Sequence, residues 1–167
     1  MEDDLSFNLS KKAKEKLKDK KWLKKQLEKG KSPQELLGFS DEAMLRFYTA
    51  AYKLFEHHHY EDAANAFLFL ITLNSFHHDY WLGLGMSIQL LGDYEAAIDA
   101  YEMAAICKLE SPVPYFYLAK CLFAIHDRES SVQALDLAIE YSGDEFQFAD
   151  LKAQAIAARD LLLKDFT

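Results

Sequence analysis

The side chains best suited to chemistry in this 167-residue chain are its six histidines, five of which stand in two runs. The runs are His57 to His59 and His77 to His78. A metal site needs ligands that converge on one ion at about 2 Å, usually with neighbouring groups that orient each ring. Adjacent histidines on a turn diverge instead. We therefore interpret both runs as solvated turn residues and expect neither a metal nor a cofactor.

No arrangement of nucleophiles or carboxylates in the sequence indicates an enzyme. The chain has no glycine-rich phosphate loop, no nucleophile elbow and no His-Glu-x-x-His motif. Its acidic residues are scattered over predicted outer helical faces, where solvated carboxylates are usual. Cys107 and Cys121 both fall within helical patterns, so we expect reduced, buried thiols. We expect a non-enzymatic protein with no catalytic residues.

The composition favours helices as the elements that position these side chains. Twelve β-branched residues stand against 25 Leu and 21 Ala, and Gly and Pro together number only nine. A chain of this length is expected to bury one sizeable core. We predict an all-α protein.

A repeat with a period of 34 residues organises most of the chain. Residues 60–64, Tyr-Glu-Asp-Ala-Ala, return at 94–98 as Tyr-Glu-Ala-Ala-Ile, and a divergent copy stands at 128–132. Aromatic and small positions recur at the same offset, which is the register of the tetratricopeptide repeat. Its small residues, such as Gly85, let two antiparallel helices approach closely. We predict helix pairs at about 41–56 and 60–73, 77–91 and 94–107, and 112–125 and 128–141.

These pairs give three tandem repeats that stack into a concave superhelix, with further helices at both ends. We predict a basic helical arm over 1–31, with one helix from Ser10 to Lys29, and a repeat domain over 32–167. A capping box at Ser32 opens a short helix that stops at Gly38. The repeats cover about 41–74, 75–109 and 110–143, and a capping helix covers about 145–165.

Turn residues differ between the repeats. Gly92 ends the first helix of the second repeat, whereas His58 and His126 occupy the equivalent positions in the other two. Glycine tolerates a left-handed backbone, and a histidine there is less comfortable. The turns after the first and third repeats' leading helices are therefore expected to be strained if they are left-handed.

Charge divides the chain unequally. Residues 11–31 hold eleven Lys and three acidic residues, a local charge of +8, while the remainder carries −16. The lysines could meet phosphates or anionic lipid, although the absence of Arg disfavours base recognition, and nucleic acid is an unlikely partner. A second interpretation is that apolar arm residues pack on a second subunit or on the acidic body: Leu9, Ala13, Leu17, Trp22, Leu23 and Leu27. The third is a solvated, partly frayed arm.

The first helix of each repeat leaves one face free of packing positions. In the first repeat this face carries Leu45, Tyr48, Tyr52 and Phe55, in the second Asp79, Leu82, Met86 and Gln89, and in the third Val113, Phe116, Lys120 and Phe123. A large exposed apolar face usually marks a binding site. An extended segment could place its side chains there, with Gln89 and Lys120 meeting its backbone or C-terminal charge. The alternative is that the aromatic residues pack beneath a terminal helix.

No segment predicts export or a membrane span. The N-terminus lacks a basic and then apolar layout, and the longest strongly apolar run, Ala66 to Ile71, is too short to cross a bilayer. We expect a cytoplasmic protein.

Four stretches carry a more specific likeness than the repeat alone: residues 60–63, 82–86 and 92–98, and the start of the third repeat at Pro112 and Pro114. Through them the sequence resembles, over about residues 33–143, the class II chaperones of bacterial type III secretion systems, which carry hydrophobic translocator proteins. The resemblance implies a cytoplasmic bacterial chaperone that keeps translocators soluble and secretion-competent by binding a Pro-x-Leu-x-x-Pro segment in its concave groove. It also implies a homodimer formed through N-terminal regions. The client-facing residues would be Tyr48, Tyr52, Phe55, Leu82, Met86, Phe116 and Phe123.

Two features depart from that family's pattern. The arm is more basic than the resemblance leads us to expect, and His58 replaces a usual glycine. A general tetratricopeptide scaffold, or a regulator whose arm contacts nucleic acid or membrane, is the alternative function.

Overall fold

The computed structural model describes residues 11–164, apart from the side chain of Ala13. Leu9, Ser10 and the side chain of Ala13, which the sequence analysis assigned to the arm, lie outside the described part. Every regular element between residues 11 and 164 is a helix, so the all-α prediction is confirmed. None of the helices described is long and apolar enough to cross a membrane.

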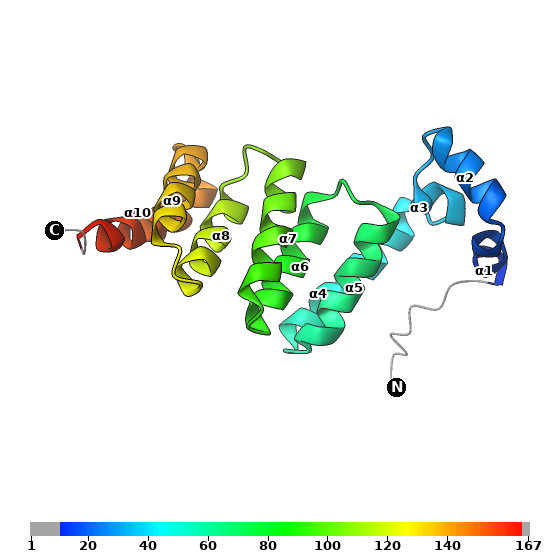
Figure 1. Ribbon diagram of the computed structural model, residues 1–167, viewed down its shortest axis with the longest axis horizontal. Coiled ribbons are helices and arrows are strands. Elements are labelled where there is room, and N and C mark those ends of the chain that lie inside the picture. The colour runs from blue at the N-terminus through cyan, green and yellow to red at the C-terminus, as the bar shows by residue number, and fades with distance from the viewer. Residues whose placement is uncertain (1–10, 165–167) are drawn as a thin grey trace. The chain divides into compact units, whose positions relative to one another are not determined.

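The helices follow the predicted repeat closely. The three hairpins begin and end within about a residue of the positions that the 34-residue period predicts. Three of their six helices, α4, α7 and α9, also carry a local start signal. Ser40, Asp93 and Asp127 each accept a hydrogen bond from a backbone N–H in the first turn of the helix that follows. The elements are α1 Lys11–Lys18, α2 Lys20–Glu28, α3 Pro33–Leu37, α4 Asp41–Glu56, α5 Tyr60–Leu73, α6 His78–Leu90, α7 Tyr94–Cys107, α8 Pro112–Ala124, α9 Arg128–Ser142, a 3-10 turn η1 Phe146–Phe148, and α10 Ala149–Lys164 (Figure 1).

The chain forms two compact units, Met1–Phe76 and His77–Thr167. The described part of the basic arm, residues 11–31, falls within the first of these units. The arm contacts α3 within the first unit, where the Lys16 Nζ donates a hydrogen bond to the carbonyl of Leu36 at 2.9 Å. The basic segment and the first hairpin therefore belong to one body.

Asp19 breaks the arm that the sequence predicted as one helix. Its side chain accepts a hydrogen bond from the backbone N–H of Trp22 at 3.0 Å and so starts a new helix. Because the aspartate serves as an N-cap, its own backbone leaves the helical region. The single helix from Ser10 to Lys29 is therefore wrong within the described residues, which form α1 and α2.

In the first unit, α4 and α5 form a hairpin with an aromatic cluster at its open end. The rings of Phe39, Phe47 and Phe69 meet edge to face, with centroids 5.4 to 6.5 Å apart. Such edge-to-face contacts are favourable because ring edges are positive and ring faces negative. The capping box at Ser32 and the end of the short helix at Gly38, both predicted, direct the chain into this cluster, and Gly38 is left-handed with φ 74°.

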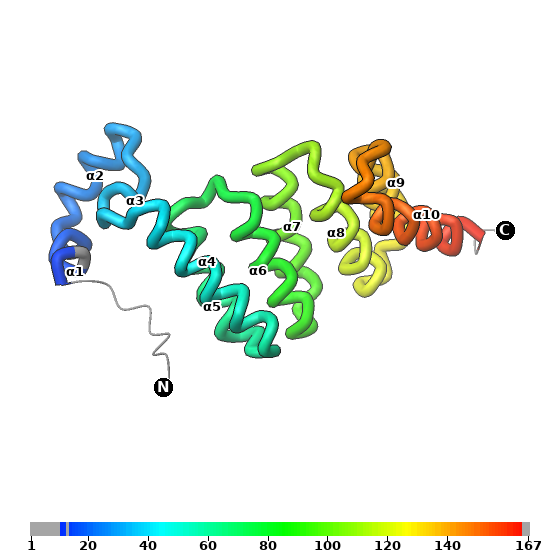
Figure 2. Tube along the Cα trace, turned by 180° about the vertical axis from the view of Figure 1, so that it is seen from behind, coloured from blue at the N-terminus to red at the C-terminus, as the bar shows by residue number. Residues whose placement is uncertain are grey.

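In the second unit each helix from α6 to α10 packs against the next one along the chain (Figure 2). The inner core consists of Ala97, Tyr101 and Cys121, all fully buried. A second core beneath α10 is built around Phe116, Leu135, Ala138 and Ala155. Alanine at the crossing points lets neighbouring helices approach closely.

Gly85 marks the closest approach in the second unit. A Cβ atom at this position would lie 2.8 Å from Cε1 of Tyr101 and 2.9 Å from Cδ1. Real Cβ atoms essentially never come that close, and Tyr101 has no exposed surface into which to move. The absence of a side chain at Gly85 is thus required for α6 to pack on α7.

Gly85→Ala is expected to lower the free energy of unfolding by about 1 to 3 kcal/mol, because the added methyl group overpacks the tyrosine ring. Chemical denaturation followed by circular dichroism measures the change. The same substitution should cost less in a Tyr101→Leu background, in which the ring is gone. An equal cost in both backgrounds would contradict the proposed clash.

The predicted strain at the histidine turns is present. His58 has φ 64° and His126 has φ 66°, in the left-handed region where Gly92 has φ 87°. His58 is partly compensated, since its Nδ1 lies 2.6 Å from the hydroxyl of Tyr60. No equivalent contact holds the ring of His126 among the described residues.

His126→Gly is expected to raise the free energy of unfolding by about 0.5 to 1 kcal/mol. A non-glycine residue in the left-handed region destabilises the fold by roughly 1 to 2 kcal/mol, and glycine removes this strain. The net gain is smaller, because glycine also gives the unfolded chain more conformational freedom to lose on folding. His58→Gly should gain less, because it also loses the contact with Tyr60. Thermal melts of both variants check the order, and a larger gain at His58 would refute it.

Candidate functional site

The predicted free face of α4 carries a continuous row of rings in the first unit. Tyr48 stacks on Tyr52 with centroids 6.3 Å apart, and Tyr52 contacts Phe55 at 6.2 Å. Phe55 in turn contacts Tyr60, the first residue of α5, at 5.6 Å. Three of the four residues predicted for this face are therefore in mutual contact.

This row is open to solvent on one side. Tyr52 is 44% exposed and Leu45 is 63% exposed, while Tyr48 and Phe55 are half-buried. Tyrosine combines a rigid apolar ring with a polar tip, which suits it to reversible binding surfaces. The structure thus offers a preformed aromatic surface along α4.

In the second unit, the predicted residues of α6 lie over the inner core. Leu82 and Met86 are half-buried and pack against the cluster of Ala97, Tyr101 and Cys121. Gln89 lies one turn further along α6, and its Oε1 accepts a hydrogen bond from the hydroxyl of Tyr101 at 2.6 Å. The buried tyrosine therefore fixes the orientation of this amide.

Burial controls the protonation of the groups beneath this face. It raises the pKa of the Tyr101 phenol well above its usual range, so the hydroxyl remains protonated and keeps donating to Gln89. Burial likewise raises the pKa of the Cys121 thiol to about 11, against a smaller opposing effect of Lys120. A protonated, buried thiol is a poor nucleophile, as the sequence predicted for this residue.

Phe116 occupies a different environment from the other predicted residues. Only 7% of it is exposed, and it belongs to the core beneath α10. The alternative in which aromatic residues pack under a terminal helix therefore applies to Phe116, though not to Phe123, which is 54% exposed. Both side chains nonetheless line one apolar pocket.

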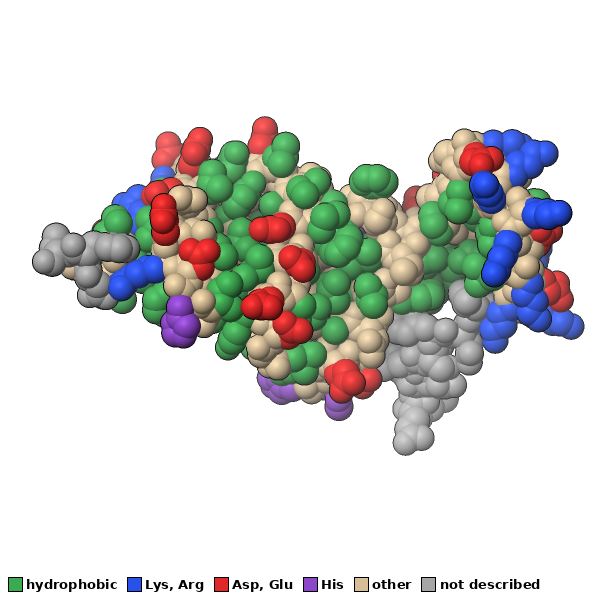
Figure 3. All heavy atoms as spheres, viewed as in Figure 1, with side chains coloured by type: hydrophobic (Ala, Val, Ile, Leu, Met, Phe, Trp, Pro, Cys, Tyr) green, Lys and Arg blue, Asp and Glu red, His purple; other side chains and the backbone are tan. Residues whose placement is uncertain are grey.

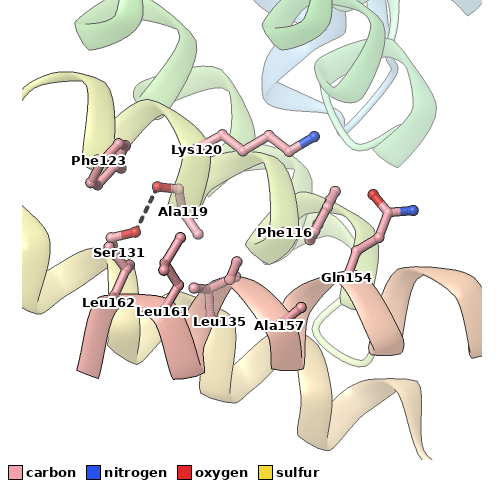
Figure 4. Close-up of a pocket in the computed structure, with 11 residues that line it drawn as sticks. Phe116, Ala119, Lys120, Phe123, Ser131, Leu135, Gln154, Ala157, Leu161 and Leu162 are labelled. Carbon is pink, nitrogen blue, oxygen red and sulfur yellow. Dashed lines mark hydrogen bonds between the residues drawn. The ribbon is translucent and has the colours of Figure 1, made fainter. Parts of the chain in front are cut away.

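The pocket lies between α8, α9 and α10 and has a volume of about 410 Å³ (Figure 4). Phe116 and Phe123 enter it from α8, Leu135 from α9 and Leu161 from α10. Two lining residues are joined to each other: the hydroxyl of Ser131 on α9 donates a hydrogen bond to the carbonyl of Ala119 on α8 at 2.8 Å. A cavity of this size and lining is typical of sites that hold apolar side chains or small ligands.

Lys120 supplies the charge beside the pocket. Its Nζ lies 4.3 Å from the ring centroid of Phe116 and 5.2 Å from that of Tyr117. Cations are attracted to the faces of aromatic rings, which holds the ammonium group close to the apolar lining. It forms no ion pair with any carboxylate of the described residues, so the ammonium group is available to an incoming acceptor.

The contribution of α10 to the pocket is not predicted from the sequence, which indicates only a capping helix here. Three of the residues that line the pocket come from this helix and lie beside its buried residues Ala155 and Leu162: Gln154, Ala157 and Leu161. These three residues stand three and four positions apart, so helical spacing alone places them on one face of α10 and is the signal that could have found them.

The remaining predicted residues lie elsewhere. Leu17 and Leu27 are exposed on the arm, and Trp22 and Leu23 are half-buried. The histidines make separate contacts. The Nδ1 of His57 lies 2.7 Å from the carbonyl of Lys53 in its own helix, and that of His78 lies 2.8 Å from the carbonyl of Ala104 in the neighbouring helix α7. Within the described part of the chain, no three His, Cys, Asp or Glu side chains come together as a metal site would require.

Comparisons with known proteins identify the family. No family model matches the sequence. The low calcium response locus protein H of Yersinia pestis is 30% identical over 115 residues, which cover 69% of this chain and 68% of that protein. The chaperone protein SicA of Salmonella typhimurium is 24% identical over 133 residues, 80% of this chain and 78% of that protein.

A solved structure shares both the fold and the sequence pattern. The type III secretion chaperone SycD of Yersinia enterocolitica, in complex with a peptide of the translocator YopD, superposes with a TM-score of 0.75. It is 25% identical and covers 77% of this chain and 98% of its own. The chain belongs to the translocator chaperones of type III secretion systems. This membership confirms the tetratricopeptide fold and the non-enzymatic character that the sequence predicted.

For this translocator chaperone, the link between Tyr101 and Gln89 can be tested directly. Tyr101→Phe is expected to lower the free energy of unfolding by about 1 kcal/mol, because it removes one hydrogen bond and leaves the ring packing intact. Tyr94→Phe, on the exposed start of α7, is the control and should change stability little. Equal effects in urea denaturation would argue against a role for the bond.

Proposed function

We propose that this translocator chaperone binds an extended segment of a hydrophobic translocator protein on the free face of its leading helices. The observation that carries the proposal is the aromatic row of α4, in which Tyr48, Tyr52 and Phe55 contact one another and remain partly exposed. A protein has little reason to keep a row of stacked rings open to water unless a partner covers it.

Each unit offers a candidate binding surface of its own. The first unit carries the aromatic row and Leu45, and the second unit carries Leu82, Met86 and the pocket beside Phe123. An extended peptide alternates its side chains between two faces, so apolar residues at intervals can enter separate depressions while the backbone stays available for hydrogen bonds. Gln89 and Lys120 are the polar groups at hand for that backbone or for a flanking carboxylate.

The chemistry of the ligand follows from the family. SycD has been solved with a peptide of the translocator YopD, and PcrH with the chaperone binding region of PopD. The resemblance implies a segment of the form Pro-x-Leu-x-x-Pro. Proline suits such a surface because it holds the segment extended before binding and so reduces the entropy lost on docking.

The same proposal gives the biological setting. The chaperone acts in the bacterial cytoplasm, where a translocator with apolar segments must be kept from aggregating before export. It forms a homodimer, as the dimeric form of SycD supports.

Tyr52→Ala and Phe123→Ala are each expected to weaken binding of a synthetic Pro-x-Leu-x-x-Pro peptide by about fivefold to thirtyfold, the range typical of aromatic interface residues. Isothermal titration calorimetry measures the affinities. Phe116→Ala is unsuitable for this test because Phe116 is a core residue, and its removal would unfold the site.

Matched controls remove the same side chains from other exposed positions. Tyr94→Ala and Phe146→Ala should leave the affinity unchanged, since these residues lie outside the proposed surface. Circular dichroism verifies that all four variants remain helical. Unaltered affinity in both Tyr52→Ala and Phe123→Ala would refute the assignment of the face.

A further inference from the structure

The Lys-rich arm, residues 11–31, is a charged surface that client binding does not use. Ten of its eleven lysines are exposed, and Lys16 alone is half-buried, held by the carbonyl of Leu36. Between described residues, no arm lysine lies within ion-pair distance of a carboxylate. Like charges packed this densely repel one another, so the arm is stabilised by any polyanion that lies against it.

We propose that α1 and α2 form a docking surface for an anionic lipid leaflet. Figure 3 shows the Lys and Arg side chains in blue gathered over these two helices. Within α2, Lys21 and Lys25 are spaced four residues apart and so lie on one side of the helix, and Lys24 is exposed beside them. Clusters of four to eight lysines on an amphipathic helix are typical of proteins that bind acidic lipid headgroups.

Apolar side chains between the lysines favour lipid over nucleic acid. Leu17 is 42% exposed and Leu27 is 49% exposed. A surface that bound only the phosphates of a nucleic acid would make no use of these two apolar side chains. At a membrane surface these leucines can enter the boundary between headgroups and acyl chains, where buried apolar area adds to the electrostatic attraction. The arm also has no Arg, the residue that most often pairs with base edges or grips phosphates with two hydrogen bonds.

The arm is folded in a way that keeps its charges outward. Asp19 starts α2 as an N-cap, and the side chains of Trp22 and Leu23 are both half-buried. The Nζ of Lys16 lies 5.8 Å from the Trp22 ring centroid, and its bond to Leu36 ties α1 to α3. The lysines are thus presented from short anchored helices, which lowers the entropy lost when they settle on a surface.

Sedimentation of the full-length protein with vesicles tests the proposal. We expect binding to vesicles made of equal parts phosphatidylserine and phosphatidylcholine at low salt, none to pure phosphatidylcholine, and loss of binding at high salt. Equal binding to both vesicle types, or no binding to either, would overturn the proposal.

Two double variants of equal charge locate the surface. Lys21→Gln with Lys25→Gln should lower vesicle affinity by about 25-fold, since each lysine that reaches an acidic surface contributes a factor of about five. The control is Lys53→Gln with Lys108→Gln, which removes the same charge from exposed positions outside the arm and should change affinity by less than about twofold. Equal losses in both would show an effect of net charge alone and reject the arm as the docking surface.

Leu27→Gln separates lipid from nucleic acid. It should weaken vesicle binding by at least about threefold, because the exposed leucine no longer enters the interface. Binding to a duplex DNA probe is measured in parallel. Tighter binding to the DNA than to the vesicles at the same salt, together with insensitivity to Leu27→Gln, would assign the arm to nucleic acid and refute the lipid proposal.

Discussion

The fit of Gly85 against the ring of Tyr101 is the constraint on which the second unit depends. Because no side chain separates the two helices, the tyrosine is fully buried, and its hydroxyl reaches Gln89 on the free face of α6. The same ring stacks on Tyr117 with centroids 5.7 Å apart, so α8 is positioned by it as well. One close contact thus sets the spacing of three helices and the orientation of a surface amide.

Most of the fold could be predicted from the sequence because its information is local and periodic. The 34-residue repeat gives the hairpins, and residues such as Ser32, Ser40 and Asp93 give their starts through side chains that accept first-turn hydrogen bonds. The arm was harder. Asp19 looks like one more helical residue among lysines, and only its bond to the N–H of Trp22 reveals a helix start.

For the candidate site, the sequence could predict which residues share a helix face but not how deeply each one is buried. Helical spacing correctly brought Tyr48, Tyr52 and Phe55 to one face, since neighbours three and four apart must share a side of a helix. Burial of Phe116 could not be read from the same spacing, because it depends on where α10 crosses α8 and α9. Such crossings are long-range contacts between segments with no sequence relation, and they also determine that Gln154 and Leu161 face the pocket.

The last helix is held to the stack by few side chains. Only Ala155 and Leu162 of α10 are buried, while Leu161 is 65% exposed and Leu163 is 46% exposed. Helix ends fray at little cost, and segments with few buried contacts open far more often than the core does. The wall of the pocket that α10 supplies is therefore the part of the second unit expected to yield first, while Tyr101 and the helices packed around it stay in place. If a client side chain enters this pocket, as we propose, a yielding wall would let the pocket take apolar side chains of different sizes.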